Sequence, residues 1–184
     1  MKADYVIVGG GSAGCVLANR LSEDPGNQVL LIEAGGKDWN PLIHIPAGYM
    51  KLLDHPTLTW GFKADRDSGL NGREINYPRG RVLGGSSSIN GMIYIRSQPE
   101  DYDHWAQLGN RGWSSGDVLP YFNKSEKWQG PDKAAHGKDG FLYTSPSRDQ
   151  PELCQAAIEA GQQMGWDYRD DLNDLPHGLG VVQG

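Results

Sequence analysis

Three glycines near the N-terminus, Gly9, Gly11 and Gly14, have the spacing G-x-G-x-x-G, and an acid, Glu33, follows. The first glycine permits a tight turn, the second lets a pyrophosphate approach the backbone, and the third allows a helix to pack closely on a strand. An acid about 20 residues further on suits the hydroxyl groups of a ribose. The pattern therefore predicts a dinucleotide site. The alternative, a glycine-rich turn with a solvated glutamate, does not explain this register.

The elements that must position these residues can be predicted from the flanking sequence. An apolar run at 5–8 indicates a strand, and residues 13–21 have apolar side chains at helical spacing. Turn residues at 22–27 end that helix, and 28–32 predicts a second buried strand that ends on Glu33. The result is a βαβ unit, in which the free N–H groups and the positive end of the helix face the phosphates.

A second glycine-rich stretch begins at Gly84 and Gly85 and continues with three serines at 86–88. It gathers N–H groups and hydroxyls in one region, which suits an anion or a polar ring edge. The serines could also cap the apolar run 89–95 if that run begins as a helix. A flexible linker is the alternative. It is disfavoured by the apolar residues around the stretch: Val82, Leu83, Ile89, Met92, Ile93 and Ile95.

Residues 37–76 show little periodicity and contain many glycines and prolines. A segment of this length without regular structure is usually functional, and its aromatic content predicts that it packs down as a cofactor-covering segment. A structural excursion between two sheet elements is the alternative. Further along the chain, the sequence predicts helices over 99–108, 117–128 and 151–164, a strand over 141–144, and polar loops over 130–140 and 168–184.

Composition narrows the function classes. The chain has 184 residues and a formal net charge of −6 with no basic run, which argues against a nucleic-acid partner. No apolar run could span a bilayer, and the first strand begins too early for a signal or transit peptide, so we expect an intracellular protein. Cys15 and Cys154 form no metal pattern, and Cys15 is expected to pack beside the glycine turn. We expect ordinary surface or loop roles for the histidines: His44, His55, His104, His136 and His177.

The whole chain resembles the N-terminal part of the glucose-methanol-choline (GMC) oxidoreductases, and within that family its choline and alcohol dehydrogenases. The match rests on 4–14, 30–35 and above all 80–96, which is close to a family signature. Shorter matches continue it at 101–102, 119–122, 136–137 with Gly140, and 171–173. Ser97 and Phe141 depart from the family pattern. Tyr77 stands where some members attach the flavin through a histidine, which argues against a covalent link.

The resemblance implies an α/β, Rossmann-like FAD-binding fold with the beginning of an α+β substrate domain. Residues 1–130 would form the FAD-binding domain, with 37–76 as its lid, and 131–184 would begin the substrate domain. The residues implied to hold the ADP half of FAD, with their immediate neighbours, are Gly9, Gly11, Ser12, Ala13, Gly14, Glu33 and Ala34. Those implied to lie along the pyrophosphate and flavin ring are Val82, Gly85, Ser86, Asn90, Gly91, Met92 and Ile93.

The implied reaction is hydride transfer from a primary alcohol, choline-like or otherwise, to N5 of FAD. The family's catalytic histidine lies far downstream, and none of the five histidines matches it, so catalytic residues are expected after Gly184 and the chain alone is expected to be inactive. Two other interpretations stay open: an inactive flavin-binding remnant and an NAD(P)-dependent reductase. The electron acceptor is unassigned. We expect a cytoplasmic protein, with peripheral attachment to a membrane left open.

Overall fold

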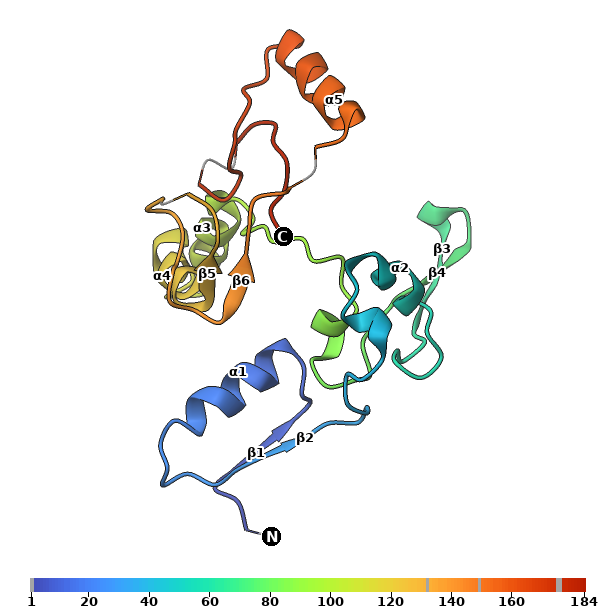
Figure 1. Ribbon diagram of the computed structural model, residues 1–184, viewed down its shortest axis with the longest axis vertical. Helices are drawn as coiled ribbons and strands as arrows, with labels where there is room; N and C mark the ends of the chain where they lie inside the picture. The colour runs from blue at the N-terminus through green and yellow to red at the C-terminus, as the bar shows by residue number, and fades with distance from the viewer. Residues whose placement is uncertain (1, 132, 149, 175–176) are drawn as a thin grey trace. The chain divides into compact units, whose positions relative to one another are not determined.

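The computed structural model describes residues 2–131, 133–148, 150–174 and 177–184 (Figure 1). The chain divides into two compact units, Met1–Met92 and Ile93–Gly184, and each is described by itself. This division is one of packing. The functional boundary near residue 130 remains a prediction, since packing alone does not test it.

The first unit opens with the predicted βαβ motif. It consists of β1 (Tyr5–Val8), α1 (Ser12–Leu21) and β2 (Val29–Ile32). The two strands pair in parallel, with Tyr5 opposite Val29 and Val8 opposite Ile32. Parallel neighbours need a crossover connection, and α1 supplies it (Figure 1). The sequence therefore placed all three elements to within about one residue, because each is bounded by glycines or turn residues.

The segment 37–76 contains more regular structure than its sequence indicates. Three single-turn 3₁₀ helices lie at Pro41–Ile43, Pro46–Gly48 and Ser68–Leu70, with a short α2 (Tyr49–Leu52) and an antiparallel hairpin of β3 (Lys63–Asp67) and β4 (Arg73–Asn76). Every residue of β3 and β4 is exposed. Because neither face is buried, no apolar alternation marks these strands in the sequence. Asn71 and Gly72, both with positive φ, make the turn.

The described residues of the second unit form three α-helices and a small parallel sheet. Its elements are α3 (Pro99–Gln107), α4 (Ser115–Ser125), β5 (Glu126–Trp128), β6 (Leu142–Thr144) and α5 (Glu152–Gln163). The helices expected over 99–108 and 151–164 and the strand over 141–144 are confirmed. β5 pairs in parallel with β6. Ser114 caps α4 by accepting a hydrogen bond from Asp117 N.

One expected helix is too long, and one helix that the sequence left open does not form. The helix predicted to continue to Trp128 ends at Ser125, because Glu126 is extended (φ −84°, ψ 143°) and begins β5. The run 89–95 does not become a helix either. A single 3₁₀ turn, Gly85–Ser88, precedes it, and Met92 takes a positive φ of 56°, which interrupts any helical continuation.

Candidate cofactor site

The geometry of the first glycine turn accounts for two of its three glycines directly. Gly9 has a φ of +98°, a left-handed value that favours glycine. A Cβ on Gly14 would lie 1.9 Å from the carbonyl oxygen of Gly9, so any side chain there would push α1 away from β1. Gly11 differs, since the nearest atom to a Cβ on it would be the Cα of Gly85 at 3.8 Å. The protein itself therefore leaves room at Gly11, and a ligand can use that room.

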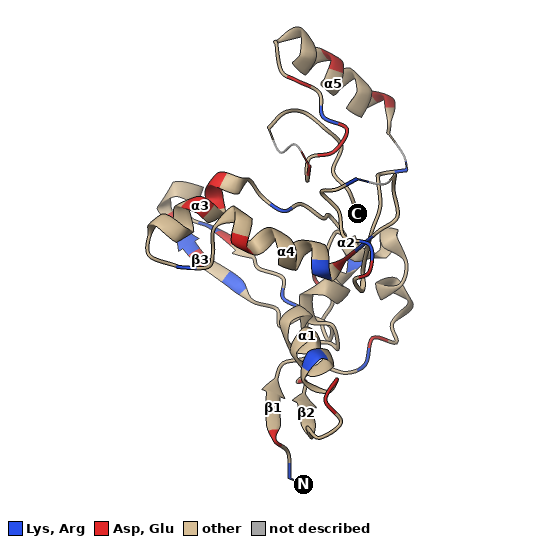
Figure 2. Ribbon diagram, turned by 90° about the vertical axis from the view of Figure 1, so that its left-hand side faces the viewer, with Lys and Arg blue, Asp and Glu red and all other residues tan. Residues whose placement is uncertain are grey.

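The N-terminus of α1 suits a negatively charged group. Gly11 is its N-cap, no side chain caps it, and its first turn contains no acid. Its only charged residue, Arg20, lies in the last turn, where it is favourable to the helix dipole. Figure 2 shows α1 without acidic residues. The residues of the first turn, Ser12, Ala13 and Gly14, are three of the predicted contacts. Their N–H groups have no side-chain acceptor and are available to an anion.

Glu33 lies where the sequence placed it, directly after β2. One carboxylate oxygen accepts a hydrogen bond of 2.6 Å from Gly10 N, and the other accepts one of 2.8 Å from Gly35 N. These bonds hold the half-buried acid against the glycine turn, and an ionised carboxylate has further acceptor sites. The neighbouring Ala34 is exposed. The two backbone bonds thus orient the Glu33 carboxylate in the absence of a ligand, and its oxygens can still accept hydrogen bonds from hydroxyl groups.

The second glycine-rich stretch packs directly on the first. Gly84 N donates a hydrogen bond of 2.7 Å to Gly10 O. A Cβ on Gly85 would lie 2.8 Å from the Cα of Gly11, and both Gly84 and Gly85 have positive φ values, +94° and +60°. Val82 also forms a parallel bridge with Gly36. Two stretches about 70 residues apart, which the sequence assigned separately to one cofactor, therefore meet backbone to backbone, as their glycines require.

The serines of the second stretch bond mainly to their own loop. Ser87 donates a hydrogen bond to Gly84 O and Ser88 donates one to Leu83 O, at 2.6 and 2.8 Å. Ser86 accepts one from Gly80 N at 3.1 Å, so its hydroxyl hydrogen can still be donated elsewhere. Of the three hydroxyls, only that of Ser86 keeps a hydrogen that these bonds do not use.

The remaining predicted contacts differ in what they can offer. Val82 is fully buried, so its side chain contributes packing and only its backbone could meet a ligand. The side-chain oxygen of Asn90 accepts a hydrogen bond from Met92 N at 3.1 Å, which shapes the turn at Gly91. Met92 is 43% exposed, and Ile93, the first residue of the second unit, is 64% exposed. Both are apolar side chains exposed to solvent.

Among the described residues, no group of three or more His, Cys, Asp and Glu is arranged to hold a metal, and no helix is both long and apolar enough to cross a membrane. Cys15 is half-buried, and its thiol donates a weak hydrogen bond to Gly10 O at 3.2 Å. It therefore packs against the glycine turn, as expected.

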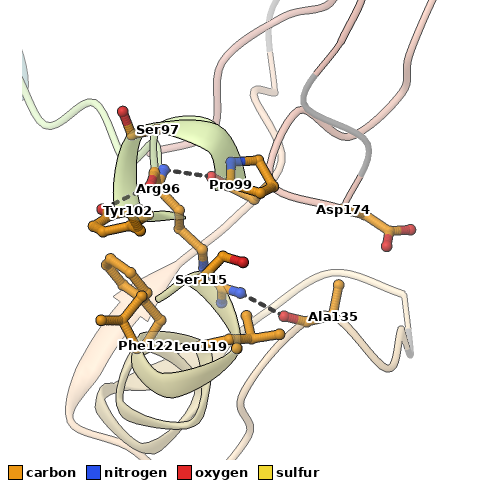
Figure 3. A pocket seen from close by; sticks show the side chains of 12 residues that line it. Arg96, Ser97, Pro99, Tyr102, Ser115, Leu119, Phe122, Ala135 and Asp174 are labelled. Carbon is orange, nitrogen blue, oxygen red and sulfur yellow. Dashed lines mark hydrogen bonds between the residues drawn. The ribbon is translucent and has the colours of Figure 1, made fainter. Parts of the chain in front are cut away.

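A cavity of about 290 Å³ lies within the second unit, between α3 and α4. Figure 3 shows Tyr102, Leu119 and Phe122 on its walls, with the Arg96 guanidinium reaching the carbonyl oxygen of Ala135. Tyr102 donates to Arg96 O. Burial raises the pKa of Tyr102, so its hydroxyl stays protonated at neutral pH. Two of the polar residues that line this space, Arg96 and Tyr102, are thus engaged with groups of the same unit.

Sequence reasoning was wrong about one histidine. His136 is buried, stacked on Trp128 with ring centroids 3.9 Å apart, and bonded to two carboxylates, rather than lying at the surface. Its partners, Glu126 and Asp171, are also buried. The only signal in the sequence was Glu126, an acid close to Trp128. Because the apolar residues of that stretch predicted a helix, Glu126 was assigned to the exposed polar face of that helix.

A sequence model of GMC oxidoreductases matches residues 3–183. The chain belongs to this family. Oxygen-dependent choline dehydrogenases from Rhizobium etli (strain CIAT 652) and Brucella ovis are 45% and 46% identical to it over 184 residues, which is 100% of this chain and 34% of each relative. The chain thus spans about a third of the length of the curated relatives it matches.

Solved structures give the same assignment. Pyridoxine 4-oxidase from Mesorbium loti matches with a TM-score of 0.86 and 39% identity, over 94% of this chain and 34% of that one. A formate oxidase matches with a TM-score of 0.85 and 28% identity, over 98% and 34%. The α/β, Rossmann-like fold expected of an FAD-binding domain is therefore confirmed, and membership of an oxidoreductase family that includes choline dehydrogenases is established.

Proposed function

We propose that this chain is the FAD-binding part of an oxidoreductase that oxidises a primary alcohol. The observation that carries the proposal is the contact between the two glycine-rich stretches beside Glu33. Gly11 and Gly85 approach each other without side chains, and the N-terminus of α1 opens next to them. A diphosphate bound there would meet backbone N–H groups and the positive end of a helix dipole.

The proposed contacts divide by chemistry. The glycine turn, Ser12, Ala13, Glu33 and Ala34 hold the ADP half, with the glutamate carboxylate accepting from ribose hydroxyls. Residues 82–93 follow the pyrophosphate and the flavin ring, where Ser86 can donate a hydrogen bond and Met92 and Ile93 supply apolar cover. When bound, FAD accepts a hydride from the alcohol carbon at N5. The residues of this chain bind and orient the cofactor, and 37–76 covers it.

The substrate is proposed by similarity. The curated relatives are choline dehydrogenases, which favours choline or a similar primary alcohol. We retain 1–130 as the FAD-binding domain, 131–184 as the beginning of the substrate domain, and a cytoplasmic location as part of this proposal. Because the chain spans about a third of these relatives, we expect it to bind FAD without oxidising alcohol by itself.

A Gly11→Ala variant tests the site most sharply. A Cβ there meets only Gly85 Cα at 3.8 Å, an ordinary contact, so the fold should be retained, but the methyl group would occupy the space left for the pyrophosphate. We expect FAD binding, followed by quenching of flavin fluorescence, to weaken about tenfold or more, equivalent to about 1.4 kcal/mol.

The matched control is Gly116→Ala, where a Cβ would lie 4.0 Å from the nearest side-chain atom, Ser114 Oγ, within the second unit. Its affinity for FAD should equal that of the unaltered chain. Equal FAD affinity in Gly11→Ala would refute the proposed pyrophosphate site. Binding of NADH in preference to FAD would instead favour a nicotinamide-dependent reductase, which Glu33 alone would equally suit.

A further inference from the structure

The proposed flavin contacts end at Ile93, and the segment directly after them is held by the side chain of Asn173. Its Oδ1 accepts a hydrogen bond of 2.8 Å from Arg96 N, and its Nδ2 donates one of 3.2 Å to Tyr94 O. Nδ2 also donates to Oε1 of Gln183. The amide therefore uses its oxygen and both of its N–H groups. Its orientation is fixed by its partners, because Arg96 N can only donate and Tyr94 O can only accept.

The side chain of Asn173 takes the place of a pairing strand along this segment. Tyr94 forms an antiparallel bridge with Gln183, and Tyr94 N donates a hydrogen bond of 2.8 Å to Gln183 O. In an extended chain, the N–H and C=O of one residue and the N–H of the residue two further on lie along the same edge. Asn173 therefore continues, on that edge, the pairing that Gln183 begins.

This pairing decides which side chains the segment directs outward. Tyr94 is half-buried and Arg96 is buried, whereas Ile93 and Ile95 are 64% and 54% exposed. Burial thus alternates along the segment, as side chains do in an extended chain. Because the backbone of residues 94–96 is held on one edge, Ile93 is directed to the exposed face, opposite to Tyr94.

The turn that carries Asn173 is anchored on buried residues. Asp171 Oδ1 accepts hydrogen bonds from Asn173 N at 3.0 Å, from Asp174 N at 3.2 Å and from Gln183 Nε2 at 2.6 Å. Asp171 is itself buried, and its other oxygen lies 2.8 Å from Nε2 of the buried His136. The amide of Asn173 is therefore fixed in position by groups other than the segment that it holds.

We propose that Asn173 is a positioning residue for the flavin: by fixing the backbone of residues 94–96, it sets the direction of Ile93 at the end of the flavin-facing stretch. The inference rests on the proposed FAD site and adds to it a residue from a distant part of the sequence. Asn173 touches neither cofactor nor substrate in this role. Its effect is on the surroundings of the flavin ring, whereas the ADP half depends on the glycine turn and Glu33.

An Asn173→Ala variant tests this role in the full chain with FAD bound. We expect its affinity for FAD to fall by about threefold or less, against about tenfold for Gly11→Ala, because the groups that hold the diphosphate and ribose are unchanged. The visible circular dichroism of the bound flavin should nevertheless shift towards that of free FAD. Asn110→Ala is the matched control, since it removes one exposed hydrogen bond, to Trp105 O, in the same unit. Its flavin spectrum should equal that of the unaltered chain.

The outcomes separate this inference from the function on which it rests. If the unaltered chain does not bind FAD, the proposed function fails and the positioning role fails with it. If the unaltered chain binds FAD and Asn173→Ala gives the same flavin spectrum, the proposed function stands and the positioning role is refuted. An equal spectral shift in Asn110→Ala would also refute it, because the effect would not be specific to the segment 94–96.

An Asn173→Asp variant separates hydrogen bonding from side-chain volume. The new oxygen would face Tyr94 O and Gln183 Oε1, which are both acceptors, so this variant should shift the flavin spectrum as Asn173→Ala does. The spectrum of the unaltered chain in Asn173→Asp would refute the role of the amide donors. If neither variant folds, amide hydrogen exchange of the unaltered, FAD-free chain decides. The N–H of Arg96 should exchange slowly, and exchange at the rate of an unstructured peptide would refute the proposal.

Discussion

The interactions that stabilise the first unit internally differ from those that stabilise the second. In the first, the closest approaches are between glycine backbones, and the apolar side chains of the βαβ motif remain largely exposed: Val6 57%, Val8 84%, Val16 59%, Leu17 52% and Ile32 47%. In the second, a charged network fills the interior and each of its groups has a partner. Parallel strands normally have both faces covered.

Both units leave large apolar side chains exposed, among them Leu153 (81%) and Met164 (75%) in the second, so the difference lies in what each unit encloses. The first unit is shaped to meet something else, since its glycines leave room for a ligand and its sheet leaves apolar surface uncovered. The buried charged groups of the second unit are paired internally, which specifies one arrangement of its segments, although the buried Asn123 Oδ1 has no partner among the described residues. Substitutions that remove a charge should therefore damage the second unit most, and substitutions that add volume should damage the first.

The largest expected effect is in the second unit. Replacing Arg96 by Met removes hydrogen bonds of 2.6 Å to both Glu126 and Ala135 O and leaves a buried carboxylate undercompensated. Breaking a buried ion pair from one side costs about 3–5 kcal/mol, measurable by urea unfolding. Arg79→Met, which removes an exposed stacking contact with Tyr77 and an exposed hydrogen bond of 2.7 Å to Pro78 O, is the control and should cost about 1 kcal/mol or less. Equal costs would show that the network does not stabilise the unit.

A smaller effect is expected from added volume in the first unit. In Gly14→Ala, the new methyl group would collide with Gly9 O, and backbone atoms cannot move aside as a side chain can. Overpacking of this kind costs about 1–3 kcal/mol. Gly116→Ala, in open space on a helix, should instead be neutral or stabilising by up to about 1 kcal/mol. A stable Gly14→Ala chain would mean that α1 is not held tightly against β1.

An effect of similar size is expected when the pH is lowered. Because the pKa of Asp171 is lowered in the folded state from its ordinary value of 3.8, the unfolded chain binds a proton first as the pH falls. The stabilisation that the Asp171 carboxylate gives to the folded state is therefore present above about pH 4. It is lost as the pH falls towards the lowered pKa of the folded state. We expect this loss to be about 2 kcal/mol, typical of hydrogen bonds to a charged group. Unfolding midpoints between about pH 5 and pH 2 should fall less steeply in Asp171→Asn; parallel slopes would contradict this prediction.

The sequence by itself determined those elements whose boundaries and key residues are marked by neighbouring residues in the chain. The glycine spacing, the strands beside it and the acid after β2 all lie within one short stretch, and the structure places them as predicted. The same holds for α3 and α5, where proline at the start and glycine after the end mark the helix boundaries. The hairpin β3–β4 was not predicted, because exposed strands show no alternation of apolar and polar residues.

The tertiary structure alone decided which distant residues meet. No local pattern indicates that Gly11 would approach Gly85, or that Glu126 would leave a helical pattern to join His136 and Asp171 in a buried network. Such contacts depend on how elements pack after they have formed, whereas periodicity describes only neighbours along the chain. The chemical types of these residues can be read from the sequence. Which residues meet depends on two further requirements: buried charges must be paired, and the space between backbones must be filled.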